Sequence, residues 1–91
     1  MNHKPVQEVE SLLNTARICI AAGDYVGAAG LYKAALRRIR DERGSADSWI
    51  ADVFEEFAAV HAACGRFKKC ESIYNRVCVI RKLHQAKLEC A

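Results

Sequence analysis

The feature that most constrains this fold is a repeat within the chain. Gly23 and Gly65 lie 42 residues apart, and the stretches around them match at that offset. Three further pairs are identical: Ala16 and Ala58, Ala21 and Ala63, and Tyr32 and Tyr74. Three more pairs are similar: Ile18 and Val60, Tyr25 and Phe67, and Leu31 and Ile73. A period of this length indicates one supersecondary unit present twice, in which each copy buries its apolar face on the other.

The repeated unit is predicted to be a pair of helices. Alanine is abundant and Pro5 is the only proline, which favours helix over strands and turns. Apolar residues recur every three or four positions in the first stretch: Val6, Val9, Leu13, Ala16 and Ile20. With glycines as helix stops, the pattern predicts helices over 5–22, 25–42, 46–64 and from 67 to near the end. Asp24 and Ser45 are the expected caps of the second and third helices.

Both copies carry the same order of small and aromatic residues. In the first copy these are Ala16, Gly23, Tyr25, Ala28, Tyr32 and Ala35. In the second copy they are Ala58, Gly65, Phe67, Cys70, Tyr74 and Val77. This pattern resembles the tetratricopeptide repeat, with a period similar to that of kinesin light chain repeats. Departures from the family pattern fall at Thr15, Cys19, Cys70 and Val77.

The resemblance implies an all-α fold with two tandem helix-turn-helix repeats, over about 5–44 and 45–91. Four antiparallel helices would form a right-handed solenoid in one domain, 1–91. Ala16 and Ala58 would lie where the helices of each hairpin cross. Tyr32 and Tyr74 would be buried between hairpins, where large aromatic side chains contribute most of the stability.

For function, the resemblance implies a non-catalytic module that binds a protein or peptide segment in a groove. The first helix of each repeat would supply the groove residues: Glu10, Leu13, Asn14, Arg17, Ile20, Asp52, Glu55, Glu56, Ala59 and Ala62. Four of them are acidic, among them Asp52, Glu55 and Glu56 of the third helix, so the expected partner carries Lys or Arg beside a bulky apolar residue. A clamp for a carboxylate tail is disfavoured for the same reason.

The basic residues suggest an alternative function. The second and fourth helices hold 12 of the 14 Lys and Arg residues: Lys33, Arg37, Arg38, Arg40, Arg43, Arg66, Lys68, Lys69, Arg76, Arg81, Lys82 and Lys87. Such a face could contact nucleic acid or an anionic surface. Basic residues near helix ends are also favoured by the helix dipole alone. No aromatic residue is expected on that face for base stacking, which favours a protein partner.

Self-association is a further expectation, most simply as a symmetric homodimer. Its candidate residues are two glycines on the second helix and an apolar stripe on the fourth: Gly27, Gly30, Ile73, Val77, Ile80 and Leu83. A following hairpin would normally cover such a stripe, and an uncovered one usually marks an interface. The alternative for the glycines is that they are tolerated on the surface.

Catalysis, metal and cofactors are not expected. His61 and Cys64 share a helix face and Cys70 lies across the turn, but His61 is expected to pack in the hairpin. No phosphate-binding loop or nucleophile–base spacing occurs, and no apolar run is long enough to span a membrane. The odd count of five cysteines and the absence of a secretory signal predict free thiols and a cytoplasmic location. Cys90 is the candidate for a reactive thiol.

Overall fold

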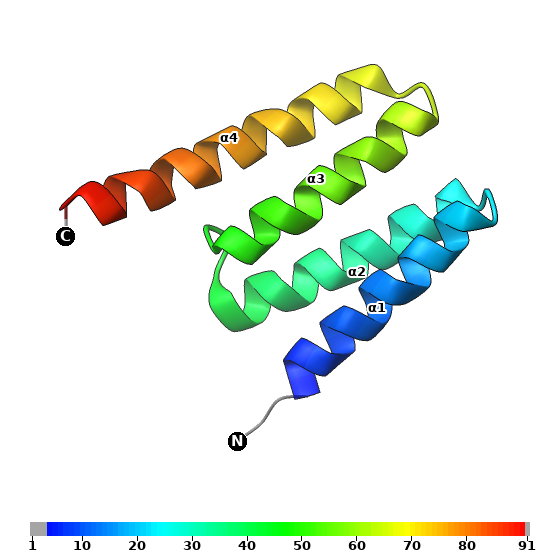
Figure 1. The fold of residues 1–91 in the computed structure, drawn as a ribbon, viewed down its shortest axis with the longest axis horizontal. Helices are drawn as coiled ribbons and strands as arrows, with labels where there is room; N and C mark the ends of the chain where they lie inside the picture. Colours follow the sequence, from blue (N-terminus) through cyan, green and yellow to red (C-terminus); the bar gives the residue numbers. More distant parts are fainter. Residues whose placement is uncertain (1–3, 91) are drawn as a thin grey trace.

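Four helices make up the fold (Figure 1). The computed structural model describes the backbone of residues 4–90 and the side chains of residues 6–87. The helices are α1 (Lys4–Ala21), α2 (Tyr25–Arg43), α3 (Ser48–Ala63) and α4 (Phe67–Cys90). No strand occurs within residues 4–90. The all-α class and the number of helices are therefore confirmed.

The turns that follow α1 and α3 are closed by the same backbone hydrogen bonds. Asp24 N–H donates to the Cys19 carbonyl at 2.8 Å, and Arg66 N–H donates to the His61 carbonyl at 2.8 Å. Gly23 and Gly65 have φ angles of 81° and 78°. Glycine reaches this left-handed region without a steric penalty, so it ends a helix and lets the chain reverse. Both predicted helix stops are thus confirmed.

The helix caps agree with the sequence at one position and differ at another. The Asp24 carboxylate accepts a hydrogen bond from Gly27 N–H at 2.9 Å, as expected of the α2 cap. The prediction of Ser45 as the cap of α3 is wrong, because Asp47 is the cap and accepts from Trp49 N–H at 3.0 Å. A carboxylate caps as well as a hydroxyl and also interacts favourably with the positive end of the helix dipole. Helix α3 accordingly begins at Ser48 rather than at residue 46.

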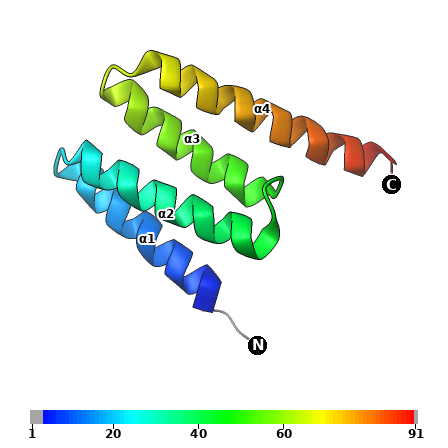
Figure 2. The same ribbon diagram turned by 180° about the vertical axis from the view of Figure 1, so that it is seen from behind.

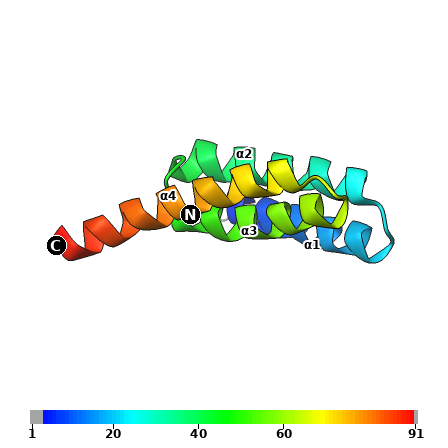
Figure 3. The same cartoon turned by 90° about the horizontal axis from the view of Figure 1, so that it is seen from above.

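Each helix turns back alongside the one before it (Figures 1 and 2). The packed pairs are α1 with α2, α2 with α3, and α3 with α4. The resulting body is flat, measuring 44 × 36 × 16 Å. Figure 3 shows α2 on one side of this body and α1 and α3 on the other. The C-terminal part of α4 extends beyond the other three helices (Figures 1 and 3).

The core is centred on Tyr32, whose side chain is 1% exposed. Its ring lies against Phe57 of α3, with ring centroids 6.0 Å apart. Fully buried alanines allow the helix backbones to approach closely: Ala16, Ala28, Ala35, Ala51 and Ala58. The predicted burial of Ala16 and Ala58 is confirmed, and so is the burial of Tyr32.

Matched residues of the two copies differ in burial because their helices have different neighbours. Helix α3 packs between α2 and α4, whereas α1 contacts α2 on one side. Val60 of α3 is therefore 3% exposed, while its match in α1, Ile18, is 68% exposed. The expectation that Tyr74 is buried like Tyr32 is wrong, since Tyr74 is 41% exposed. Helix α3 covers Tyr32, and no described helix covers the corresponding face of α4.

The two glycines in α2 have different local surroundings. A Cβ atom added at Gly27 would collide with the Asp24 carboxylate that caps the helix. A Cβ atom added at Gly30 would meet no atom within 4 Å. Gly27 is thus explained by the cap, whereas Gly30 is open to solvent in this structure.

We expect Gly30→Ala to raise the free energy of unfolding by about 1 kcal/mol, because alanine is the better helix former and has room. Gly27→Ala gives no such gain, since displacing the cap costs about 1 kcal/mol and offsets the propensity term. Urea denaturation of both variants measures the difference. Equal stabilisation at the two positions would contradict this account of Gly27.

Candidate partner-binding surfaces

The predicted groove lies on the side formed by α1 and α3, which we call the α1–α3 face. Most of its predicted residues are accessible or half-buried: Glu10, Asn14, Arg17, Ile20, Asp52, Glu55, Glu56, Ala59 and Ala62. Leu13 is the exception, with 2% of its surface exposed. It faces the core with Val9 and Ala16, so its prediction as a groove residue is wrong.

Glu56 connects three helices on this face. Its carboxylate accepts two hydrogen bonds from Arg17 of α1, at 2.7 Å and 3.0 Å, and one from the Tyr32 hydroxyl of α2, at 2.9 Å. The Arg17 hydrogen bond is the main reason that the pKa of Glu56 lies below its ordinary value. Burial is the main reason that the pKa of Tyr32 rises to about 12. Glu56 therefore acts as a link between the two hairpins.

The other two acids that α3 contributes to the α1–α3 face are also paired. Arg81 of α4 donates to both Glu55 oxygens, at 3.0 Å and 2.9 Å, and to Asp52 at 3.3 Å. These hydrogen bonds raise the pKa of the Arg81 guanidinium, with the Glu55 bond contributing most. All three α3 carboxylates thus have an arginine of the same chain as partner, whereas Glu10 of α1 forms no ion pair within the described residues. A basic partner segment would have to displace these arginines, which weakens the case for this face.

The predicted self-association stripe is not a continuous exposed surface. Val77 and Ile80 are 3% and 6% exposed because they pack in the core against α3. Ile73 is half-buried, and Leu83 is 50% exposed. The expectation that all four form an uncovered stripe is therefore wrong. Self-association itself stays a prediction.

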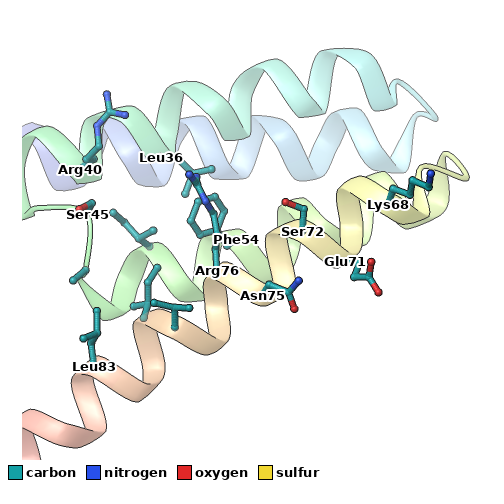
Figure 4. Close-up of a pocket in the computed structure, with 14 residues that line it drawn as sticks. Leu36, Arg40, Ser45, Phe54, Lys68, Glu71, Ser72, Asn75, Arg76 and Leu83 are labelled. Carbon is teal, nitrogen blue, oxygen red and sulfur yellow. The ribbon is translucent and has the colours of Figure 1, made fainter.

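A second surface, which the sequence analysis did not single out, lies between α2 and α4 (Figure 4). It is an open groove of about 710 Å³ that we call the α2–α4 groove. Its apolar residues are Leu36, Ala46, Ile50, Phe54, Val79, Ile80 and Leu83. Its polar and charged residues are Arg40, Ser45, Lys68, Glu71, Ser72, Asn75 and Arg76. Its volume lies in the range of about 300–1,000 Å³ that is typical of binding sites, and its lining is divided evenly between apolar and polar residues.

Regular helix spacing builds the α2–α4 groove. Leu36 and Arg40 are four residues apart on α2, and Ile50 and Phe54 are four apart on α3. On α4, the spacings of four, three and four place these residues on one face: Ser72, Arg76, Val79 and Leu83. Figure 4 shows Arg76 extending over Phe54 toward Leu36 of α2. The guanidinium carbon of Arg76 lies 6.0 Å from the Phe54 ring centre.

The α4 sequence contained a signal for this groove. Val79 and Leu83 continue an apolar pattern beside the core positions Val77 and Ile80, so the apolar arc of α4 is wider than contact with α3 alone requires. Val79 and Leu83 are 57% and 50% exposed. Which neighbouring helix lies beside that extra arc depends on tertiary packing, so the sequence pattern by itself did not identify α2 as the opposite wall.

His61 is buried, as predicted. It is 4% exposed, and its ring lies 4.6 Å from that of Phe57. Its Nδ1 atom has no hydrogen-bond partner. Desolvation lowers the pKa of His61, and the positive charges of Lys69, Arg66 and Lys33 lower it further. The folded protein therefore favours the neutral imidazole.

Because His61 is buried, we expect the stability of the protein to depend on pH in mild acid. Because the pKa of His61 is lowered on folding, the unfolded chain takes up the proton first, and the free energy of unfolding should fall as the pH drops below about 6.5. His61→Leu should remove this contribution, whereas His84→Gln, at an exposed position of α4, should retain it. Thermal unfolding between pH 7.5 and 5, at about half-unit steps, compares the three proteins. Parallel curves for the wild type and His61→Leu would contradict the prediction.

Candidate chemistry elsewhere in the described chain is limited. Cys19, Cys64, Cys70 and Cys78 are free thiols, and the side chain of Cys90 lies outside the described residues. Within the described residues, no three His, Cys, Asp or Glu side chains are grouped so that they could hold a metal ion. No described helix combines the length and apolar character needed to cross a membrane.

No family model, curated protein or solved structure matches this chain. The likeness to tetratricopeptide repeats therefore rests on the internal pattern of the chain.

Proposed function

We propose that the chain is a non-catalytic protein-binding module of two tetratricopeptide-like repeats, arranged as a right-handed solenoid, and that it holds a partner segment in the α2–α4 groove. The observation that carries the proposal is the groove itself, which joins a buried apolar base to exposed apolar walls. Ile50 and Ile80 are 3% and 6% exposed, whereas Val79 and Leu83 are about half exposed. An apolar surface of this kind, bordered by polar residues, is typical of a protein interaction site.

The α2–α4 groove is favoured over the α1–α3 face for an electrostatic reason. Three of the four acids on the α1–α3 face already have intramolecular arginine partners, which a ligand would have to replace. In the groove, by contrast, Lys68, Glu71 and Arg76 form no ion pair within the described part of the chain. Their charges are available to a partner without breaking an existing bridge.

To test the proposal, peptides that bind the folded protein are selected from a displayed library of random sequences. Peptides that bind the proposed site should bind Leu83→Asp at least about tenfold more weakly, because a charge is placed where apolar contact is made. Phe67→Asp is the matched control, since Phe67 is an exposed apolar residue of the same helix that does not line the groove. Circular dichroism confirms that both variants remain helical.

Two results would contradict the proposal. One is that no selected peptide distinguishes Leu83→Asp from Phe67→Asp, which would place binding elsewhere. The other is that Leu83→Asp converts a dimer to a monomer in sedimentation while peptide binding is absent. The groove would then be an interface between copies of this chain.

A further inference from the structure

Resting on the proposed function, we infer from the charges and shape of the α2–α4 groove that its partner is an acidic amphipathic helix. This helix places bulky apolar side chains on the groove base and carboxylates along the groove rims.

The groove border is positively charged on both walls. Its lining includes three cations, Arg40 of α2 and Lys68 and Arg76 of α4, against one carboxylate, Glu71. Lys33 and Arg37 precede Arg40 at spacings of four and three, so they extend the positive rim along the exposed side of α2. Carboxylates on a partner would meet cations on either side of the groove, whereas a basic segment would be repelled.

Existing contacts leave most of these cations able to accept a ligand. Arg40 contacts Asp41 at 3.7 Å, but both side chains are more than half exposed, and such pairs contribute little. Arg76 lies over the Phe54 ring and extends toward Leu36 of α2. Arginine can stack on an aromatic ring and still bind a carboxylate through two N–H groups.

The shape of the groove favours a helix as occupant. Helices α2 and α4 form its walls, and α3 and α4 supply the apolar residues of its base, Ile50, Phe54 and Ile80. An amphipathic helix presents apolar residues at spacings of three and four along one stripe, with its charges on the flanks. That arrangement places apolar anchors against the exposed Val79 and Leu83 and acids toward Arg40 and Arg76.

Nucleic acid is the less favoured occupant. Unstacked bases need an accessible aromatic face, and Phe54 is half-buried beneath Arg76. The base of the groove is otherwise aliphatic, which suits apolar side chains better than a sugar–phosphate backbone.

The experiment uses three synthetic helical peptides of about 18 residues, or five turns. All three share one stripe of leucines, and the remaining positions are mainly Glu, Gln or Lys. Fluorescence anisotropy with the whole protein should show that the Glu peptide binds, the Gln peptide binds about tenfold more weakly and the Lys peptide does not bind. Binding of the Glu peptide should weaken as the salt concentration rises.

Two double variants with the same net charge distinguish peptide contacts in the groove from attraction to the overall charge of the protein. Arg40→Glu/Arg76→Glu should weaken binding of the Glu peptide by about a hundredfold, or tenfold for each lost cation. Lys82→Glu/Lys87→Glu makes the same change at exposed positions of α4 outside the groove, and should change binding by less than about threefold. Circular dichroism monitors folding of both.

The outcomes distinguish this inference from the proposed function. Equal binding of the Glu and Gln peptides, with both lost in Leu83→Asp, overturns the acidic partner and leaves the groove as a protein-binding site. Binding of no peptide, together with library peptides that ignore Leu83→Asp, overturns both. Binding of an RNA oligonucleotide that Arg40→Glu/Arg76→Glu abolishes, without peptide binding, assigns the groove to nucleic acid and also overturns the inference.

Discussion

Tyr32→Ala should lower the free energy of unfolding by about 3–5 kcal/mol, the range for an aromatic side chain removed from a packed core. Tyr32 is 1% exposed and contacts Phe57 across the boundary between the two hairpins. Removing its ring leaves a cavity at that boundary and also removes the hydroxyl that donates to Glu56. A domain of this size has a total stability of about 5–10 kcal/mol, so we expect the variant to be partly unfolded at 37 °C.

The repeat supplies a matched control for this prediction. Tyr74 occupies the same place in the second copy but is 41% exposed. Tyr74→Ala should therefore lower stability by only about 1 kcal/mol. Urea denaturation followed by circular dichroism measures both variants. Equal losses would mean that the Tyr74 face is covered in solution, and would give new support to self-association through α4.

Glu56→Ala should lower the free energy of unfolding by about 2 kcal/mol, because it leaves the buried Tyr32 hydroxyl without its acceptor. The Arg17 pair adds less, since its side chains are 46% and 36% exposed and water screens the charges. Glu55→Ala is the control one residue away, where the carboxylate pairs with Arg81 at the surface and meets no buried hydroxyl. We expect a much smaller loss there.

Glu56 should also cause a second loss of stability in acid, at lower pH than the one expected from His61. The pKa of Glu56 is lowered from 4.5 on folding, chiefly by the Arg17 hydrogen bond, so its stabilisation is complete above about pH 4.5. It is lost as the pH falls below that value and the carboxylate becomes protonated. Thermal unfolding between pH 6 and 3 should show a steeper decline for the wild type than for Glu56→Ala. Equal slopes would show that another carboxylate governs acid unfolding.

Tyr32 and Glu56 lie at the boundary between the hairpins, whereas the proposed binding site is the α2–α4 groove. Glu56 and Tyr32 hold α3 against α1 and α2, and α3 in turn supplies Ile50 and Phe54 to the α2–α4 groove. Loss of the Glu56 contacts should therefore loosen the base of the groove. Partner binding to Glu56→Ala should weaken together with its stability, whereas Leu83→Asp should affect binding alone.

The sequence determined the local structure of this protein. Glycines at positions 23 and 65 allow the left-handed turns, Asp24 caps α2, and apolar residues at spacings of three and four give each helix a buried face. These features depend on residues close together in the chain, so a pattern read along it is sufficient. The burial of Ala16, Ala28, Ala35 and Ala58 followed from the same pattern, because it places them on the inner faces of their hairpins.

Only the tertiary structure decided which matched residues are covered and which charges meet. Tyr32 and Tyr74 have the same local sequence context, yet α3 covers the first and no described helix covers the second. Arg17 and Arg81 come from different helices to neutralise the acids expected to attract a basic partner. The α2–α4 groove likewise requires three helices to meet. Burial and ion pairing depend on distances in space between segments far apart in the chain, and helix periodicity specifies the faces of a helix but not its neighbours.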